Sequence, residues 1–544
     1  MEKIWVRSYG EGVSRNLDYE SITMSDVLKR STANFPKAKS LEFAGNRINF
    51  KAFDDQVNQV ANALIAMGVA KGDRVALLLP NIPQVAVATY ATWRIGGVVV
   101  MNNPLYTDGE LEHQFNDSGA TVLIALDLLV PRMLKLKPKT GIKTIIVAHI
   151  RDYLRFPKKQ LFPFVAKDKH RVIPPEIDVI EWTTLLKSYS KRPPSMDVGI
   201  DDMAALQYTG GTTGVSKGVV LSHGNISKNC QQGLAWLPML KPREKVVLGS
   251  LPIFHAFGLF VLNMCVLGGW EMVLLPRPTA EEIMKAIART RVNLFPGVPT
   301  MFVDILNHPK LKQYDLSSLD LCVAGAAPCP VDILERFEQL TGAQILEGYG
   351  ISEASPATAI NPVNGKNKPG TIGLPFPDTV VKITALDDPD KEMPLGEKGE
   401  LVIKGPQVAE GYYHMAEETQ KTFKDGWLYT GDVATMDKDG YITIVDRLKD
   451  MIIASGYNIY PREIDEVLFA HPKIVEACAK GVPDPKRGET VKAYVVKQPG
   501  ETLTEKELTT YCREHLAAYK VPTLFEFLDE LPKSAVGKIL RKNL

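Results

Sequence analysis

The stretch Tyr208-Thr-Gly-Gly-Thr-Thr-Gly-Val-Ser-Lys-Gly-Val219 says more about this chain than any other segment. It combines four glycines, three threonines, a serine and Lys217 within a dozen residues. Glycine lets successive backbone N–H groups converge, because it reaches positive φ without a Cβ clash. Converging N–H groups, hydroxyls and one cation form a cradle for phosphate. An apolar run at Ala204–Tyr208 precedes the stretch, so we expect a phosphate-binding loop that follows a strand.

This loop matches neither of the two common phosphate-binding motifs. In a P-loop the lysine directly follows a glycine, whereas Val215 and Ser216 here separate Gly214 from Lys217. The pattern G-x-G-x-x-G at the start of a helix is also absent, which disfavours a dinucleotide-binding fold. An ordinary glycine turn is the alternative, but the threonines, serine and lysine packed into the loop argue against it. We therefore expect a phosphate-binding loop of a third kind.

Length and composition are those of an ordinary globular protein. A chain of 544 residues is too long for one core, so we expect two or more domains. The net charge of +1 gives no field for nucleic acid. The six cysteines include no C-x-x-C pair, which argues against zinc or a disulfide framework and indicates buried thiols in a reducing compartment. No signal peptide is evident, and the apolar run Ala256–Trp270 is too short to span a bilayer, so we expect a soluble, cytoplasmic protein.

Strand-like and helix-like patterns alternate along most of the chain. Alternation of this kind predicts an α/β fold with layered, largely parallel sheets. The expected strands are Val75–Leu79, Val292–Phe295, Leu319–Ala324 and Ala343–Leu346, and the expected helices are Glu281–Ala288 and Val331–Leu340, the latter capped by Gly342.

The pattern changes near Asp446. Beyond it come short strand-like runs (Ala477–Gly481 and Val491–Val496), a helix at Glu505–Leu516 and a tail rich in proline and lysine. With a boundary at Asp446–Asp450, we expect residues 1–446 to form a large N-terminal domain. Residues 447–544 would then form a small α+β domain.

Residues 132–171 form a basic stretch. Lysines and arginines predominate there, with Asp152 and Asp168 as the only acidic residues, and Leu154, Phe156 and Phe164 are among the apolar residues between them. A solvated insertion loop is one interpretation, and peripheral contact with an anionic membrane is another. RNA binding is a weaker one, because no recognition module surrounds the stretch.

Four further segments add chemistry, although each has an ordinary explanation when taken alone. Asp432 could be a turn residue, Tyr349 a core residue and Lys538 a solvated lysine. The segments are Glu347-Gly-Tyr-Gly-Ile-Ser-Glu353, Tyr429-Thr-Gly-Asp432, Asp446-Arg-Leu-Lys-Asp450 followed by Ser455-Gly-Tyr-Asn458, and Leu531-Pro-Lys-Ser-Ala-Val-Gly-Lys538.

Taken together and in this order, the segments resemble the adenylate-forming superfamily. That superfamily comprises acyl-CoA synthetases, firefly-type luciferases and peptide-synthetase adenylation domains, and the resemblance runs from Met24 to Lys542. It is strongest to bacterial long-chain fatty-acid–CoA ligases, through Asp425–Asp432, Asp446–Pro461 and Ala518–Pro522. It implies ATP and CoA as substrates and Mg²⁺ as the metal.

The resemblance also implies a role for each matching residue. Lys538, Lys217, Glu353 and Thr209 would be catalytic, with Glu353 holding Mg²⁺. Asp432 and Arg447 would bind the ribose, and Tyr349 would stack on adenine. Further ATP or AMP contacts would come from Gly210, Gly211, Thr212, Thr213, Gly214, Gly325, Ala326, Ala327, Pro328, Glu347, Gly348, Gly350 and Ser352. His255, Gly325 and Gly350 would border the acyl pocket, and Lys449, Ser455, Gly456 and Tyr457 would form the hinge and the CoA entry.

The loop departs from the family pattern T-S-G-T-T-G-x-P-K-G at two positions. Gly210 replaces serine and Ser216 replaces proline, so one hydroxyl donor is lost and the loop is less rigid. Ser352 stands where threonine is more usual and keeps the hydroxyl. These departures put the affinity for ATP in doubt rather than phosphate binding itself.

The leading hypothesis is an ATP-dependent acyl-CoA ligase for medium- to long-chain fatty acids. Alicyclic or aryl carboxylates are alternative substrates, and a carrier protein is an alternative acceptor to CoA. A kinase or ATP-hydrolysing switch would need ADP formation, and the absent P-loop argues against it. A non-catalytic binding protein is disfavoured because Lys217, Glu353 and Lys538 are all present. We expect no nucleic-acid partner, and the sequence leaves open both a homodimer and the membrane contact through residues 132–171.

Overall fold

The strand expected before the glycine-rich loop lies within β8 (Met203–Thr209), and the chain returns beside it as β9 (Lys217–Ser222). The two strands are antiparallel, with Thr209 opposite Lys217. This computed structural model describes residues 3–209, 216–240, 245–327, 329–454, 457–485, 487–534 and 537–544. Gly210 to Val215 of the loop therefore lie outside the described residues.

The hairpin belongs to an eight-stranded sheet with the order β19-β9-β8-β4-β3-β5-β6-β7. Its other strands are β3 (Arg74–Leu78), β4 (Val98–Met101), β5 (Val122–Leu126), β6 (Thr144–Ala148), β7 (Ile180–Glu181) and β19 (Gly411–Tyr412). Five neighbouring pairs in this sheet are parallel: β8–β4, β4–β3, β3–β5, β5–β6 and β6–β7. Side chains on both faces are buried, which explains the continuous apolar runs in the sequence.

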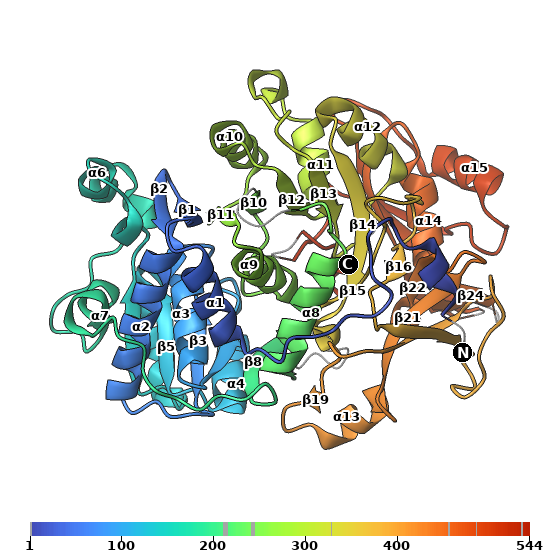
Figure 1. Ribbon diagram of the computed structural model, residues 1–544. Helices are drawn as coiled ribbons and strands as arrows, with labels where there is room; N and C mark the ends of the chain where they lie inside the picture. The colour runs from blue at the N-terminus through green and yellow to red at the C-terminus, as the bar shows by residue number, and fades with distance from the viewer. Residues whose placement is uncertain are drawn as a thin grey trace.

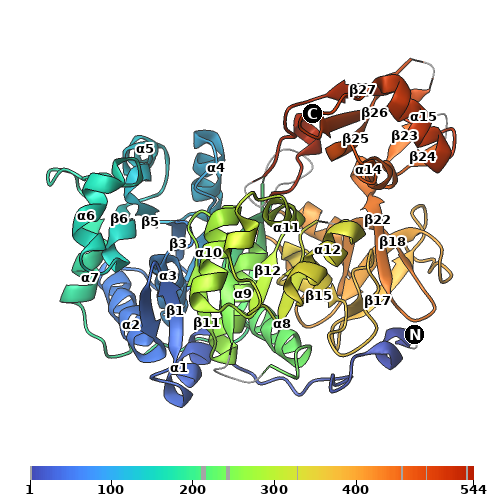
Figure 2. The same ribbon diagram turned by 90° about the horizontal axis from the view of Figure 1, so that it is seen from above.

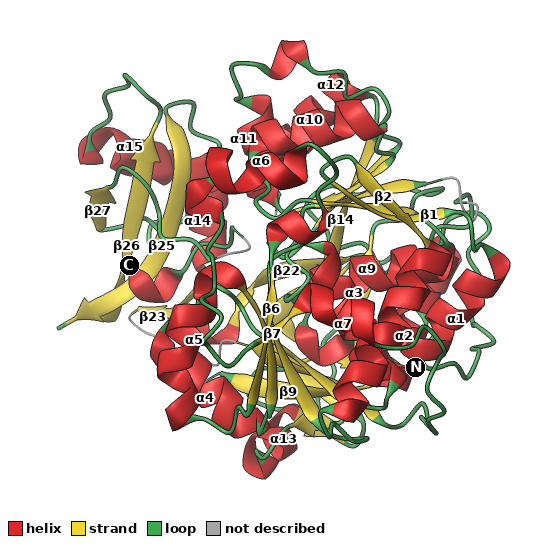
Figure 3. Cartoon of the chain, turned by 90° about the vertical axis from the view of Figure 1, so that its left-hand side faces the viewer, coloured by secondary structure: helices red, strands yellow, loops and turns green. Residues whose placement is uncertain are grey.

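Helices cover both faces of this sheet (Figures 1 and 3). One face packs against α4 (Asp108–Ser118) and α5 (Val130–Leu136). The other face packs against a helical layer that it shares with a second sheet. That layer contains α1 (Met24–Asn34), α2 (Phe50–Ala66), α3 (Pro83–Arg94), α7 (Trp182–Ser188), α8 (His223–Ala235) and α9 (Ala256–Gly268).

The second sheet has nine strands in the order β16-β15-β14-β13-β12-β10-β11-β1-β2. The strands are β1 (Lys39–Phe43), β2 (Asn46–Asn49), β10 (Val246–Gly249), β11 (Glu271–Leu274), β12 (Leu294–Gly297), β13 (Leu321–Ala324), β14 (Gln344–Gly350), β15 (Ala357–Ile360) and β16 (Leu374–Pro375). The central strands are parallel. Their outer face packs against α10 (Ala280–Thr290), α11 (Pro299–Leu306) and α12 (Val331–Thr341).

A third sheet was not anticipated from the alternation of strands and helices. Its strands are β17 (Val380–Thr384), β18 (Gly399–Lys404), β20 (Phe423–Lys424), β21 (Trp427–Met436) and β22 (Ile442–Arg447). All of their pairings are antiparallel, so the expectation of largely parallel sheets holds only for the two large sheets. The short helix α13 (Ala416–Thr422) lies between β19 and β20.

Residues beyond β22 build a fourth sheet, which stands apart from the rest in Figure 2. It consists of β23 (Ile452–Ala454), β24 (Tyr457–Ile459), β25 (Ile474–Asp484), β26 (Gly488–Lys497) and β27 (Leu524–Phe527). With α14 (Pro461–Phe469) and α15 (Glu505–His515) it encloses a hydrophobic cluster of its own. The mixed α/β architecture with a smaller C-terminal part is therefore confirmed.

Local expectations from the sequence agree closely with the structure. The helix expected at Val331–Leu340 is α12, and Gly342 ends it in the left-handed conformation with φ 73°. All six cysteines are buried and unpaired. Among the described residues, no helix is long and apolar enough to cross a membrane.

Candidate active site

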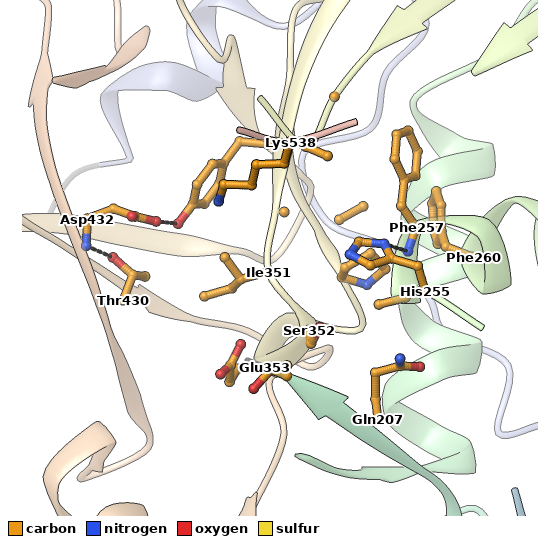
Figure 4. Close-up of a pocket in the computed structure, with 18 of the residues that line it drawn as sticks. Gln207, His255, Phe257, Phe260, Ile351, Ser352, Glu353, Thr430, Asp432 and Lys538 are labelled. Carbon is orange, nitrogen blue, oxygen red and sulfur yellow. Dashed lines mark hydrogen bonds between the residues drawn. The ribbon is translucent and has the colours of Figure 1, made fainter. Parts of the chain in front are cut away.

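A cavity of about 1770 Å³ lies where the two large sheets, the third sheet and the C-terminal segment meet. The lining comes from segments far apart in the sequence, including Thr209 and Lys217, Gly348–Glu353, Thr430–Asp432 and Lys538. Figure 4 shows Lys538 between the Asp432 end of this cavity and the end formed by His255 and Phe257. One continuous space therefore connects a polar end to an apolar end.

Lys217 lies at the polar end, at the start of β9. Its side chain is 10% exposed, and its ammonium group forms an ion pair with Glu418 of α13. The same ammonium lies 5.2 Å from the centre of the Tyr412 ring. A buried ammonium group that lines a cavity makes this end suited to an anion.

Glu353 faces the same end from the turn that follows β14. One of its carboxylate oxygens accepts a hydrogen bond from the Tyr412 hydroxyl at 2.8 Å, and Ala409 donates its N–H to the Glu353 carbonyl at the same distance. Ser352 also lines the cavity beside it (Figure 4). Among the described residues no cation is paired with the Glu353 carboxylate, so its other oxygen is available to a ligand.

Asp432 is the centre of a small network on β21. Its carboxylate accepts a hydrogen bond from the Tyr349 hydroxyl and lies 3.2 Å from the Arg447 guanidinium. Thr430 accepts a hydrogen bond from the Asp432 backbone N–H at 3.1 Å. Burial, followed by the Asp432 charge, raises the pKa of Tyr349 well above its usual value, so this hydroxyl stays protonated. The network presents a buried carboxylate and an aromatic ring to the cavity.

Lys538 enters the cavity from the C-terminal segment. The turn that carries it is closed by hydrogen bonds between Ser534 and Lys538, including a donation from the Ser534 N–H at 2.8 Å. Gly537 in that turn has φ 73°, and a Cβ there would lie 2.5 Å from Thr300 of α11. Burial, followed by the charge of Arg447, lowers the pKa of Lys538 to about 8. Lys538 is therefore mostly cationic at neutral pH and close to titrating.

His255 is the N-cap residue of α9. Its Nδ1 accepts a hydrogen bond from the Phe257 N–H at 3.3 Å (Figure 4). Burial, followed by the charge of Lys538, lowers the pKa of His255 to about 4, so the ring is neutral at neutral pH. Gln207 of β8 lies close by and donates to the Phe254 carbonyl at 2.7 Å.

The other end of the cavity is apolar and runs between α8 and α9. Its lining includes Gly233, Trp236, Leu237, Phe260, Val261, Met264, Cys265 and Trp270. Gly233 lets these side chains approach α8 closely, because a Cβ there would lie 2.8 Å from both the Met264 sulfur and the Phe260 ring. Glycine in the middle of a helix is unfavourable, so its presence in α8 is consistent with this close approach.

Three of the expected residues that the structure describes are not among those that line the cavity. The Glu347 carboxylate accepts hydrogen bonds from the N–H groups of Gly370 (2.6 Å) and Cys329 (3.5 Å) and is not part of the cavity lining. Its side chain anchors a loop, and the expected contact of Glu347 with the nucleotide stays a prediction. Ala327 is also not among the lining residues, and Tyr457 is exposed and stacks on Tyr519 in the C-terminal part.

The remaining expected residues divide into two groups. The structure brings together at the cavity Thr209, Lys217, His255, Gly325, Ala326, Gly348, Tyr349, Gly350, Ser352, Glu353, Asp432, Arg447, Lys449 and Lys538. The other group, Gly210, Gly211, Thr212, Thr213, Gly214, Pro328, Ser455 and Gly456, lies outside the described residues.

The sequence interpretation missed the segment formed by β19 and α13. It supplies Tyr412, Glu418 and Lys421 to the polar end of the cavity. Glu418 is 201 residues from its partner Lys217, so no local pattern could connect them. The only signal was the dense charge of Glu417-Glu418 and Lys421 on one short helix.

Comparison with known proteins identifies the family. The model of the AMP-binding enzyme family matches residues 28–413, and that of the AMP-binding enzyme C-terminal domain matches residues 463–538. The chain belongs to the AMP-binding enzyme family. This confirms the resemblance seen in the sequence motifs.

Relatives of this AMP-binding enzyme match it from end to end. A long-chain-fatty-acid–CoA ligase of Bacillus subtilis is 43% identical over all of this chain and 98% of its own. A ligase of the same name from Escherichia coli O6:H1 is 39% identical, again over 100% and 98% of the two chains. The crystal structure of ATP-bound MatB from Rhodopseudomonas palustris superposes with a TM-score of 0.84 at 30% identity, over 96% of this chain and 98% of that one.

Proposed function

We propose that this AMP-binding enzyme is an ATP-dependent acyl-CoA ligase for medium- to long-chain fatty acids. It activates the acid as an acyl adenylate with release of pyrophosphate, and then transfers the acyl group to CoA with release of AMP. The observation that carries the proposal is the continuous cavity, which joins an anion-binding end to an apolar end beside Lys538. The full-length similarity to long-chain-fatty-acid–CoA ligases supports it.

We assign the ATP contacts to the polar end of the cavity. Lys217, Thr209 and the glycine-rich loop hold the β- and γ-phosphates. Asp432 accepts hydrogen bonds from the ribose hydroxyls with the help of Arg447, and Tyr349 stacks on adenine. The Asp432 carboxylate suits this role, because it is held in place by two partners and still lines the cavity.

Lys538 is the residue that we place at the reacting atoms. When a carboxylate attacks the α-phosphate, two anions approach each other and charge builds up on the phosphate oxygens. A fixed cation aimed at that charge stabilises it by about 3 kcal/mol for each well-placed donor. The adenylate is prone to hydrolysis, so water has to be excluded from the cavity until the thiol arrives.

His255 is not a general base in this scheme. The acid substrate is already ionised at neutral pH and needs no deprotonation. The neutral imidazole caps α9 and, with Phe257, forms a wall at the junction of the polar and apolar ends. We propose that it borders the bound carboxylate there, together with Gly325 and Gly350.

Glu353 fits the Mg²⁺ that accompanies ATP. It offers an oxygen ligand of the kind Mg²⁺ prefers, on a half-buried side chain that lines the polar end of the cavity. The Tyr412 hydroxyl orients that carboxylate. When bound, the ion shields the negative charge of the phosphates.

The apolar end supports a fatty acid as the substrate. Its helical lining is aromatic and aliphatic, and Gly233 of α8 leaves room for the Phe260 and Met264 side chains of α9. An alicyclic or aryl acid remains the alternative substrate, because such rings also prefer apolar walls. A carrier protein remains the alternative acceptor, and dependence on CoA separates the two.

The small domain at residues 447–544 is proposed to be mobile. Lys538 is carried by this part of the chain, and Lys449 lies at its beginning, next to Arg447. A rotation about Lys449 would withdraw Lys538 and open a path for CoA past Ser455, Gly456 and Tyr457. The hinge thereby separates the two half-reactions in time.

We also propose that the protein is cytoplasmic and contacts the surface of an anionic membrane through residues 132–171. The sequence leaves a homodimer open. Helix α6 (Lys158–Val165) has no buried residue, and Phe156, Phe164 and Val165 are 81%, 73% and 76% exposed. Exposed apolar side chains among lysines suit a surface of anionic lipid.

The double variant F156S/F164S should lower binding to phosphatidylglycerol vesicles, and unchanged binding would contradict the contact.

Pyrophosphate release tests the proposed function directly. The assay uses ATP and Mg²⁺ with acids from acetate to palmitate and with benzoate, each with and without CoA. We expect CoA-dependent turnover that peaks between medium and long chains. A peak on benzoate would keep the chemistry and change the substrate, whereas formation of ADP, or no pyrophosphate with any acid, would refute the proposal.

A further inference from the structure

The segment formed by β19 and α13, residues 411–422, reaches the polar end of the cavity without belonging to any motif. It is tied to β9, the strand that starts at Lys217. Gly411 and Tyr412 pair with Val220 and Val219, and the Tyr413 N–H donates to the Gly218 carbonyl at 2.8 Å. The position of α13 is therefore linked to that of the phosphate-site lysine.

Glu418 is the residue of α13 that makes contact there. Its two carboxylate oxygens bind different lysines, one oxygen pairing with Lys217 and the other accepting from Lys421 at 3.2 Å. The side chain of Glu418 is 30% exposed, whereas that of Lys217 is 10% exposed. The carboxylate therefore lies on the more open side of the lysine and also lines the cavity.

The surroundings hold this arrangement in place. Thr419, the next residue on α13, accepts a hydrogen bond from the Tyr412 N–H at 2.9 Å and donates to the Met415 carbonyl. Tyr412 in turn places its ring beside Lys217 and its hydroxyl on Glu353. One short segment thus contacts both charged groups to which we assign the phosphates and the metal of ATP.

We propose that Glu418 is a resident counter-ion of the phosphate site, which the triphosphate of ATP displaces from Lys217 and which re-pairs with Lys217 as pyrophosphate leaves. This inference rests on the proposed role of Lys217 in binding ATP. A carboxylate beside bound phosphate repels it, so Glu418 weakens the binding of both ATP and pyrophosphate. The gain is faster departure of pyrophosphate, which makes adenylate formation harder to reverse.

The substitution E418Q tests the proposal, because it removes the charge and keeps the shape. We expect the Kd of MgATP, measured by calorimetry without any acid, to fall about fivefold, as for the loss of one nearby like charge at a partly exposed site. Product inhibition by pyrophosphate should strengthen by a similar factor. The KM values for the acid and for CoA should not change. The difference from the unmodified enzyme should shrink in high salt.

Glu417 provides a matched control. It is the neighbouring residue of α13, is exposed, and makes the same change of charge when replaced by glutamine. E417Q should leave the Kd of MgATP and the inhibition by pyrophosphate near the values of the unmodified enzyme. E418D keeps a carboxylate at this position, so its Kd of MgATP and its inhibition by pyrophosphate should lie closer to those of the unmodified enzyme than those of E418Q do.

Two results would overturn the proposal. An unchanged Kd of MgATP in E418Q would mean that Glu418 does not compete with phosphate. A raised Kd would mean that Glu418 orients Lys217 for ATP instead of opposing it. Failure of the proposed function would look different, because the unmodified enzyme would then bind no MgATP or release no pyrophosphate with any acid.

Discussion

Replacement of Lys538 by alanine should separate the two half-reactions. The side chain enters the cavity from the C-terminal segment and lies near Asp432 and Arg447. If its charge acts on the carboxylate and the α-phosphate, K538A loses adenylate formation. Thioester formation from supplied acyl-AMP needs no new bond to phosphorus, so it should remain near the rate of the unmodified enzyme.

The size of the effect follows from the charge and its environment. One well-placed cation is worth about 3 kcal/mol, which corresponds to roughly a 150-fold loss of rate. The pKa of Lys538 is lowered to about 8 by burial and by Arg447. The protonated form is the active one, so activity is present below pH 8 and is lost as the pH rises above it. The adenylation kcat/KM should therefore fall about tenfold per pH unit on the alkaline side.

Two assays and one control variant measure this. Pyrophosphate release reports adenylation, and acyl-CoA formation from supplied acyl-AMP reports the second half-reaction. Both rates are measured from about pH 6 to pH 10 in steps of about one pH unit. K538R serves as the control, because a guanidinium keeps its charge over that whole range. Any adenylation activity that K538R retains should lack the alkaline fall near pH 8.

Either of two results would refute a specific role of the Lys538 charge in adenylation. Equal loss of both half-reactions in K538A would show that Lys538 does not act specifically on adenylation. An alkaline fall that persists unchanged in K538R would show that another group titrates, and that the lowered pKa of Lys538 does not control the rate.

Three further predictions follow from single side chains. In G233V the valine side chain would collide with Phe260 and Met264, since a Cβ at this position would already lie 2.8 Å from both side chains. We expect the preferred acid to become shorter, and activity on palmitate to fall at least about tenfold in a chain-length profile. D432N should raise the KM for ATP about tenfold while leaving the KM for the acid unchanged, because a charged hydrogen-bond acceptor for ribose is lost. Burial raises the pKa of Glu347 in the folded state to about 7, from an unfolded value near 4.5. Its contribution to the free energy of unfolding is therefore present below pH 4.5 and is lost as the pH rises through 7, a change of up to about 3 kcal/mol. The melting temperature of E347Q should depend less on pH between these two values than that of the unmodified protein.

Much of the fold could be predicted because local patterns determine it. The strand before the glycine-rich loop and the succession of β13, α12 and β14 follow from apolar runs, a helical period and one glycine cap. The third sheet was missed because its strands are amphipathic and pair antiparallel, without the long apolar runs of buried parallel strands.

The site was predictable only where a motif marks it. Asp432, Tyr349 and Lys538 come from three distant segments, and the structure brings them to one cavity as the motifs imply. Side-chain direction was not predictable, because no local pattern indicates that the Glu347 carboxylate accepts a hydrogen bond from the Gly370 N–H. Contacts such as that of Glu418 depend on tertiary packing alone.

The burial of every cysteine has a practical consequence for watching the enzyme move. Thiol-reactive dyes attack the thiolate, and burial both hinders access and raises the pKa of each native thiol. The unmodified chain is thus a low-background host for labelling without prior removal of cysteines. Dyes placed through E335C on α12 and K506C on α15, both exposed positions, would report by energy transfer whether the C-terminal part changes its distance from the rest when ATP or CoA is added.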